Sequence, residues 1–158
     1  MTDIKQPRAF TIEHEYIIDR IKTQCGIYKE YDTDFNQNDS NTPIHSCIAL
    51  WDTGASRSVI STDVVQALNL ESDGKTRVFH AGGESIVYTY LINIILPNNM
   101  GTYLLEVMEC KLTGIDVLIG MDIISKGDFC ITSPQGKTKF SFQVPPTHDF
   151  DFVKECNQ

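Results

Sequence analysis

The sequence predicts a single, mostly-β domain with one or two short helices. Its 158 residues fit one domain, which can bury roughly 70 per cent of its unfolded surface. Short segments rich in β-branched and aromatic residues recur along the chain, and clusters of Gly, Asn, Asp and Pro separate them. A central aspartate loop lies between two such segments, and a Gly-Gly hairpin follows it.

The region before the aspartate loop is predicted to contain strands. Residues 10–31 are rich in β-branched and aromatic residues and suggest one or two strands, although their Glu, Arg and Lys content also permits a helix. Residues 32–43 are rich in Asn and Asp and predict a polar hairpin loop.

The central motif is Asp52-Thr53-Gly54-Ala55-Ser56. Asp-Thr-Gly also occurs in ordinary surface turns, so the three residues alone are weak support for a catalytic role. Here an apolar strand pattern precedes the motif at residues 48–51, and another strand pattern starts at Val59-Ile60. A surface turn does not usually have apolar strands on both sides, so the flanks favour a buried functional loop.

Two elements are predicted downstream of this loop. Ser61 or Thr62 can cap a helix over residues 63–68, which is predicted to have a structural role and no catalytic one. Residues 76–80 and 84–96 form a strand pair around Ala81-Gly82-Gly83, which predicts a glycine-tipped hairpin. Of the four histidines, only His80, beside this tip, is placed to affect a neighbouring cleft.

A second apolar motif lies at residues 116–122, with the sequence Asp-Val-Leu-Ile-Gly-Met-Asp. It predicts a buried strand that ends at Gly120 and leads into a helix over residues 123–126. Asp122 is expected to accept the first-turn amide hydrogens of that helix.

The C-terminal region predicts a last hairpin followed by a tail. Residues 129–132 and 137–144 flank a Ser-Pro-Gln-Gly turn. Residues 148–158 are acidic and aromatic, and are expected either to be disordered or to place residues 150–153 over an apolar groove.

Charge and composition exclude several classes of partner. The formal net charge is −8, with 13 Lys and Arg against 21 Asp and Glu, which argues against nucleic acid and anionic membranes. No signal peptide or membrane-length apolar run is present, so a cytoplasmic location is expected. The five cysteines have no metal-binding spacing and are expected to be reduced and mostly buried, and no metal or organic cofactor is implied.

The order of the aspartate loop, the glycine hairpin and Leu118-Ile119-Gly120 resembles that of the retropepsin-like aspartic proteases. The resemblance covers residues 44–144, with the aspartate loop as its most specific part. Viral members commonly have an arginine after the second-motif glycine, whereas this chain has Met121, so the resemblance is to the single-lobed bacterial and cellular type. Trp51 is bulkier than the residue usual before the aspartate, and could either disturb the loop or pack beneath it.

The resemblance implies a retropepsin-like closed β-barrel, the acid-protease lobe, with its active site at a homodimer interface. It assigns residues 41–146 to the catalytic lobe, residues 1–40 to an N-terminal strand region packed on it, and residues 147–158 to the tail. Because chain termini pair across the dimer in this family, the last hairpin is a candidate for the interface, and packing on its own lobe is the alternative.

The implied function is that of an aspartic endopeptidase acting on peptide or protein substrates. Asp52 is the implied catalytic residue, and Thr53 and Gly54 are implied to support the catalytic loop. The residues implied to bind substrate are Leu50, Ala55, Ser56, Ala81, Gly82, Gly83, Ile115 and Leu118. The alternative is a catalytically inactive dimerisation or peptide-binding module with the same fold.

Overall fold

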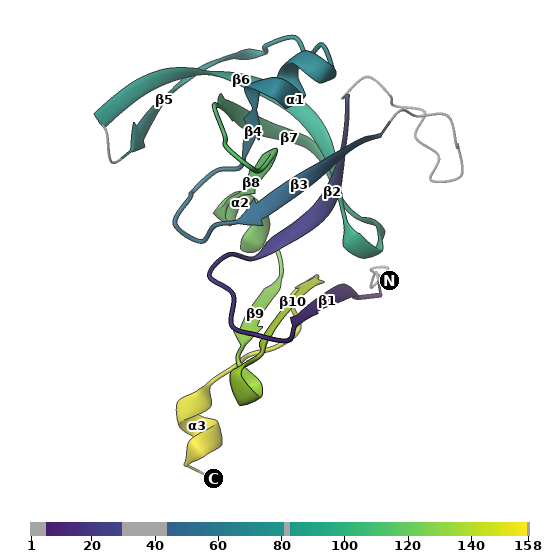
Figure 1. Ribbon diagram of the computed structural model, residues 1–158, viewed down its shortest axis with the longest axis vertical. Helices are drawn as coiled ribbons and strands as arrows, with labels where there is room; N and C mark the ends of the chain where they lie inside the picture. The colour runs from purple at the N-terminus through teal and green to yellow at the C-terminus, as the bar shows by residue number, and fades with distance from the viewer. Residues whose placement is uncertain (1–5, 30–43, 81–82, 158) are drawn as a thin grey trace, which may run out of the picture.

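Six strands close into a barrel in a computed structural model that describes residues 6–29, 44–80 and 83–157 (Figure 1). The ring runs β2–β3–β8–β4–β7–β6 and closes where β6 pairs with β2. Its strands are β2 (Lys22–Lys29), β3 (His45–Trp51), β8 (Val117–Ile119), β4 (Val59–Ser61), β7 (Met100–Cys110) and β6 (Gly83–Leu96). The closed barrel implied by the family resemblance is therefore confirmed.

The barrel interior is filled by aliphatic side chains that alternate along the ring strands. Their alternation follows from the two-residue period of a strand, which directs every second side chain inward. The most deeply buried of them are Ile27, Ile60, Ile92, Ile94, Val107, Val117 and Ile119.

A hairpin stands off the barrel where β6 extends beyond the ring. The outer half of β6 pairs with β5 (Gly74–His80), and its inner half pairs with β7 and β2. We call β5 and the outer half of β6 the flap. The predicted hairpin is confirmed in position, while its tip residues Ala81 and Gly82 lie outside the described residues, as does the predicted loop at residues 32–43.

A second, three-stranded sheet packs against one end of the barrel (Figure 1). It consists of β1 (Arg8–His14), β10 (Thr138–Val144) and β9 (Asp128–Thr132), with β10 in the centre. The strand prediction for residues 10–31 is thus confirmed as two strands, and the helix alternative is wrong. Both edges of β10 are paired within the chain, so this strand packs on its own lobe.

In the part of the chain that the structure describes, three short α-helices complete the fold, namely α1 (Thr62–Ala67), α2 (Met121–Ile124) and α3 (Phe152–Cys156). Single 3₁₀ turns lie at Pro97–Asn99 and Pro134–Gly136. Helix α1 begins as predicted, because the Val64 amide donates to the Ser61 hydroxyl at 3.2 Å. The tail was expected either to be disordered or to place residues 150–153 over an apolar groove; in the structure α3 extends away from both sheets.

All five cysteines are free thiols, but the expectation that most are buried is wrong. Cys25 and Cys47 are buried opposite each other on β2 and β3, whereas Cys110 and Cys156 are exposed. A hydrogen bond with Cys47 and burial both raise the pKa of the Cys25 thiol, so this thiol stays protonated at neutral pH.

Candidate active site

The Asp52 loop leaves β3 at the point where β3 runs parallel to β8. The Asp52 amide donates to the Ile119 carbonyl at 2.9 Å, which ties the loop to the neighbouring strand. The Gly54 amide donates to Asp52 Oδ1 at 2.8 Å, and a Cβ at Gly54 would lie 3.1 Å from the same oxygen. The glycine therefore lets the backbone come close enough to fix the carboxylate.

Gly120 lies against the far side of the same loop. A Cβ at this position would come within 2.6 Å of the Arg57 carbonyl carbon, so only glycine fits here. The next amide, that of Met121, donates to the Ala55 carbonyl at 2.8 Å. The second apolar motif thus holds both ends of the Asp52 loop.

Asp122 supports the loop in a way that differs from the prediction. Its carboxylate accepts from the Ser58 amide at 2.8 Å and from the Ser58 hydroxyl at 2.7 Å, and makes no capping bond to its own helix. Ser58 is fully buried, and its hydroxyl oxygen also accepts from the Gly120 amide at 3.1 Å. The expectation that Asp122 caps α2 is therefore wrong, because Ser58 offers it two donors.

Trp51 packs beneath the loop and does not disturb it. Its indole nitrogen donates to the Thr23 hydroxyl at 3.1 Å, which satisfies the one polar group of a buried ring. Its ring lies 4.8–6.0 Å, between centroids, from the rings of Phe10, Phe129, Phe140 and Phe142. This aromatic cluster joins the small sheet to the barrel directly below Asp52.

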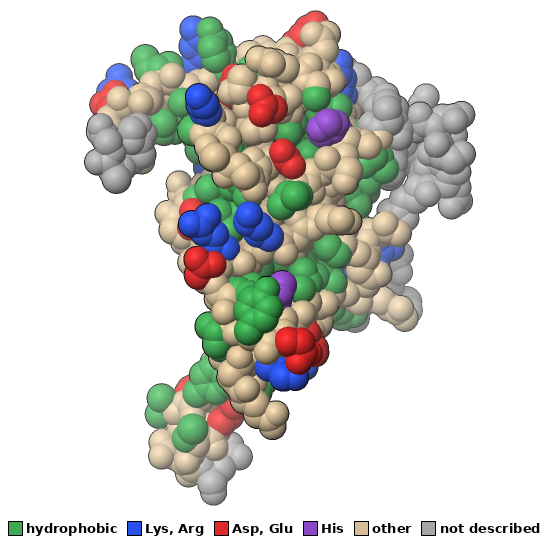
Figure 2. Space-filling model, viewed as in Figure 1, with side chains coloured by type: hydrophobic (Ala, Val, Ile, Leu, Met, Phe, Trp, Pro, Cys, Tyr) green, Lys and Arg blue, Asp and Glu red, His purple; other side chains and the backbone are tan. Residues whose placement is uncertain are grey.

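A cleft of about 880 Å³ opens between the loop and the flap. Figure 2 shows the flap overhanging a hollow on this side of the molecule. The walls of the cleft are largely apolar and include Val59, Val78, Val87, Met108 and Leu118. Asp52 lies immediately before the loop residues that form the floor.

Some of the predicted site residues meet at this cleft, and others do not. Gly54, Ala55, Ser56 and Leu118 line it, and Asp52 is half-buried beside it. Leu50 pairs with Leu118 across β3 and β8, and Ile115 precedes β8, but neither borders the cleft of the single chain. Thr53 is exposed at the loop surface, and Gly83 begins β6 with a φ of +116°. The roles of these residues stay predictions.

The prediction missed the polar residues around the cleft. Arg57, Arg77, Glu109 and Cys110 all border it. Arg57 pairs with Glu106 at 2.5 Å and Arg77 pairs with Glu84 at 2.7 Å, and neither glutamate borders the cleft. Residues 76–79 border the cleft consecutively, so the alternation of a strand would not have singled out Arg77.

A tyrosine at the base of the flap has a raised pKa. The Tyr90 hydroxyl donates to Glu109 Oε2 at 2.8 Å. Burial, together with this hydrogen bond, raises the pKa of Tyr90 to about 12. The Tyr90–Glu109 pair lies where β6 passes from the flap into the barrel.

A family model described as "gag-polyprotein putative aspartyl protease" matches residues 44–126. The match begins just before β3 and ends just after α2, so it contains the Asp52 loop, the flap and the Gly120 motif. The chain belongs to this family of aspartic proteases. The retropepsin-like identity suggested by the motifs is confirmed.

A solved structure of a retropepsin-like protease shares the fold. A retropepsin-like aspartic protease from Rickettsia conorii is 12 per cent identical with a TM-score of 0.53, and the alignment covers 87 per cent of this chain and 95 per cent of that one. The EIAV protease bound to an inhibitor is 20 per cent identical with a TM-score of 0.48, covering 69 and 88 per cent. The bacterial or cellular subtype stays a prediction. A comparison with curated proteins finds no match.

No helix within the described ranges has the length and apolar character needed to cross a membrane.

Proposed function

We propose that this protein is an aspartic endopeptidase that acts as a homodimer, with one Asp52 from each copy forming the catalytic pair. The observation that carries the proposal is the fixed Asp52 carboxylate. The Gly54 amide orients it at 2.8 Å, and the loop around it is tied to Ile119 and Met121 by backbone hydrogen bonds. Such prior fixation of a reacting group is what catalysis by positioned side chains requires.

The homodimer follows from the number of catalytic motifs. The sequence contains one Asp-Thr-Gly and no Asp-Ser-Gly, while the mechanism needs two facing carboxylates. Two carboxylates about 3 Å apart cannot both ionise, so they share one proton and titrate as a pair, as is known for aspartic proteases.

In the proposed reaction the ionised carboxylate takes a proton from water, which then attacks the peptide carbonyl. The protonated carboxyl donates to the carbonyl oxygen and stabilises the oxyanion as it forms. Proton transfer to the leaving nitrogen completes hydrolysis, and no covalent intermediate with the enzyme forms.

The cleft supports an apolar peptide as substrate. Its walls present valine, leucine and methionine side chains from β4, the flap, β7 and β8. Apolar walls gain most from apolar contact, so we propose hydrophobic side chains next to the scissile bond. The exposed flap strands would cover the peptide and release the products.

The test is the Asp52→Asn substitution, assayed on a peptide library between pH 4 and 7. The variant should lose cleavage by at least about 10³-fold, because the amide can neither accept nor share the proton. Sedimentation velocity should show the same dimer for variant and wild type. Asp63→Asn, on the exposed side of α1, is the matched control and should cleave normally.

Two results would oppose the proposal. A wild-type chain that stays monomeric at high concentration would lack the second carboxylate. A wild-type dimer that binds library peptides without cutting them would favour the peptide-binding module.

A cytoplasmic location is part of the proposal. Five cysteines that remain free thiols are typical of a reducing compartment.

A further inference from the structure

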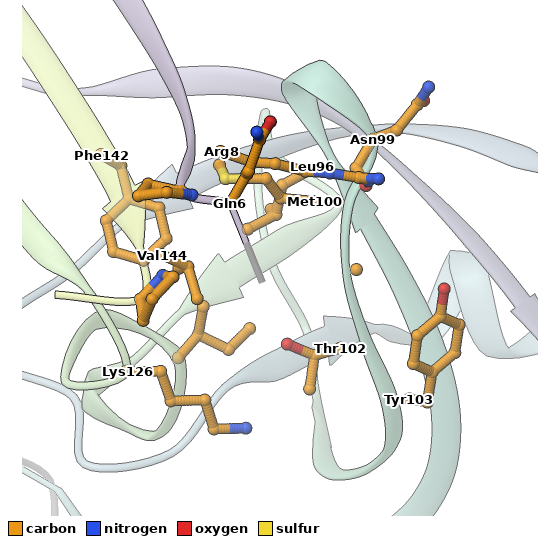
Figure 3. Close-up of a pocket in the computed structure, with 14 residues that line it drawn as sticks. Gln6, Arg8, Leu96, Asn99, Met100, Thr102, Tyr103, Lys126, Phe142 and Val144 are labelled. Atoms are coloured by element: carbon orange, nitrogen blue, oxygen red, sulfur yellow. The ribbon is translucent and has the colours of Figure 1, made fainter. Parts of the chain in front are cut away.

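A second cavity, of about 570 Å³, lies away from the Asp52 loop (Figure 3). It forms where the start of β1, the start of β7, α2 and the end of β10 come together. Its apolar wall is made by Leu96, Met100, Ile123, Phe142, Val144 and Pro145. This volume is within the usual range for ligand pockets.

The charge of this cavity is opposite to that of the whole chain. The chain has 21 acidic residues against 13 basic ones, yet the lining includes two cations, Arg8 and Lys126, and no carboxylate. Figure 3 places the two cations on opposite sides of the space. Arg8 donates to the Asn99 carbonyl at 2.8 Å, and in the described part of the chain neither cation forms an ion pair.

An apolar wall with two unpaired cations fits one kind of group. A flat or bulky apolar side chain would fill the cavity, and a neighbouring carboxylate would meet the cations.

The C-terminal tail has this chemistry in exposed residues. Within the tail, Asp151 pairs with Lys154 at 3.2 Å and Phe150 stacks on His148 at 5.3 Å between ring centroids. Phe150, Phe152 and Val153 are 53, 65 and 71 per cent exposed, and Asp149, Asp151 and Glu155 alternate with them. Figure 2 shows the green apolar side chains of α3 standing clear of the body. Adjacent exposed aromatic residues of this kind usually mark an interaction site.

A hydrogen-bonded anchor holds the tail away from the cavity of its own chain. Pro145 borders the cavity, but Asp128 then accepts from the amides of Thr147 and His148 at 2.8 and 3.1 Å. His148 Nδ1 also lies 2.8 Å from this carboxylate. From there the chain runs to α3, beyond the small sheet and remote from the start of β1 (Figure 1).

We propose that this cavity receives the C-terminal tail of a second copy of the chain. An aromatic side chain of the tail occupies the apolar part, and the neighbouring Asp149 lies beside Lys126. The second copy is the favoured occupant because each copy carries one tail and one complementary cavity. This inference rests on the homodimer of the proposed function, and adds a contact that strengthens it.

The first test measures the dimer dissociation constant of the full chain by sedimentation velocity over a concentration series. Lys126→Glu should weaken the dimer about tenfold, because it places a carboxylate opposite the acidic tail. Asp149→Lys alone should weaken it similarly, and the double variant should return to within about threefold of wild type. Lys111→Glu, just beyond the other end of β7, is the matched control and should change nothing.

The outcomes separate this inference from the proposed function. A wild-type chain that never dimerises overturns both. A dimer that cleaves peptides but has the same dissociation constant in Lys126→Glu as in wild type overturns the tail contact alone.

The second test uses a fluorescent peptide of residues 147–158. It should bind the full-length Phe150→Ser/Phe152→Ser variant, whose own tails no longer compete, at least about tenfold more tightly than the same variant carrying Lys126→Glu. Equal binding of a peptide with both phenylalanines replaced by serine would overturn the proposal. Binding of decanoate, lost in Lys126→Glu, without binding of the peptide would assign the cavity to a small apolar acid instead.

Discussion

The Asp52 loop and the flap face each other across one cleft but are held in opposite ways. The loop is fixed by hydrogen bonds. The Asp52 amide donates to the Ile119 carbonyl, and the buried Ser58 hydroxyl donates to Asp122 and accepts from the Gly120 amide. The flap is supported by the exposed Arg77–Glu84 ion pair and by Lys75, which lies 4.6 Å from the centre of the Tyr88 ring.

This difference separates the two tasks of the site. A reacting carboxylate has to be held in position before the substrate arrives, so buried hydrogen bonds suit it. A lid has to open for each substrate, so weak exposed contacts suit it. Two substitutions and one titration test this difference between the loop and the flap.

The largest effect is expected from Asp122→Ala. Ser58 would lose the acceptor for its buried amide and hydroxyl, which should lower the free energy of unfolding by about 3 kcal/mol. Chemical denaturation at a fixed protein concentration measures this, and the cleavage rate should fall as well because the Asp52 loop loosens. Asp122→Asn keeps one acceptor oxygen and should recover part of the loss. A variant as stable as wild type would show that this network does not hold the loop.

The next effect concerns Tyr90, at the boundary between the flap and the barrel. Because its pKa is raised to about 12, the folded state favours the neutral phenol. The resulting contribution to stability is complete below the ordinary tyrosine pKa of about 10, and is lost as the pH rises through 12. Absorbance titration should therefore show a phenol that ionises near pH 12, and this step should vanish in Tyr90→Phe.

Glu109→Gln is the control for the cause of the Tyr90 shift. It removes the charge but not the burial, so the late titration step should move lower without disappearing. If the late titration step does not move in this variant, burial alone raises the Tyr90 pKa.

The smallest effect is expected from Arg77→Ala in the flap. The Arg77 and Glu84 side chains are 64 and 43 per cent exposed, so loss of the pair should change the free energy of unfolding by less than about 0.5 kcal/mol. Hydrogen exchange of the β5 and β6 amides should nevertheless become faster, and Glu84→Ala should have the same result. A loss as large as that in Asp122→Ala would mean that the flap belongs to the rigid part of the molecule.

The sequence was sufficient for features that depend on neighbouring residues. The strands beside Asp52, the cap of α1, the glycine hairpin and the last hairpin all follow from local patterns of apolar, β-branched and turn residues. These patterns act over a few residues, and can therefore be read without knowing the rest of the fold.

The features that were missed depend on residues far apart in the chain. Asp122 was assigned to its own helix because its true partner, Ser58, lies 64 positions earlier. Likewise, the cavity between Arg8 and Lys126 draws its lining from four separate segments, and no local pattern marks it. The exposure of the Cys110 and Phe152 side chains could not be predicted either. It depends on where β7 ends and where α3 lies in the folded chain.

β6 is a single strand that belongs to both the flap and the barrel, which restricts where residues can be inserted into it. Ile92, Ile94 and Ile95 pair within the ring, while Ser85 and Val87 line the cleft and Ile86 faces outward. Inserting one residue between these two groups would reverse the faces of the flap and present Ile86 to the cleft. Variants that insert or delete residues in this strand should therefore change its length by an even number of residues, or change the length only at the hairpin tip.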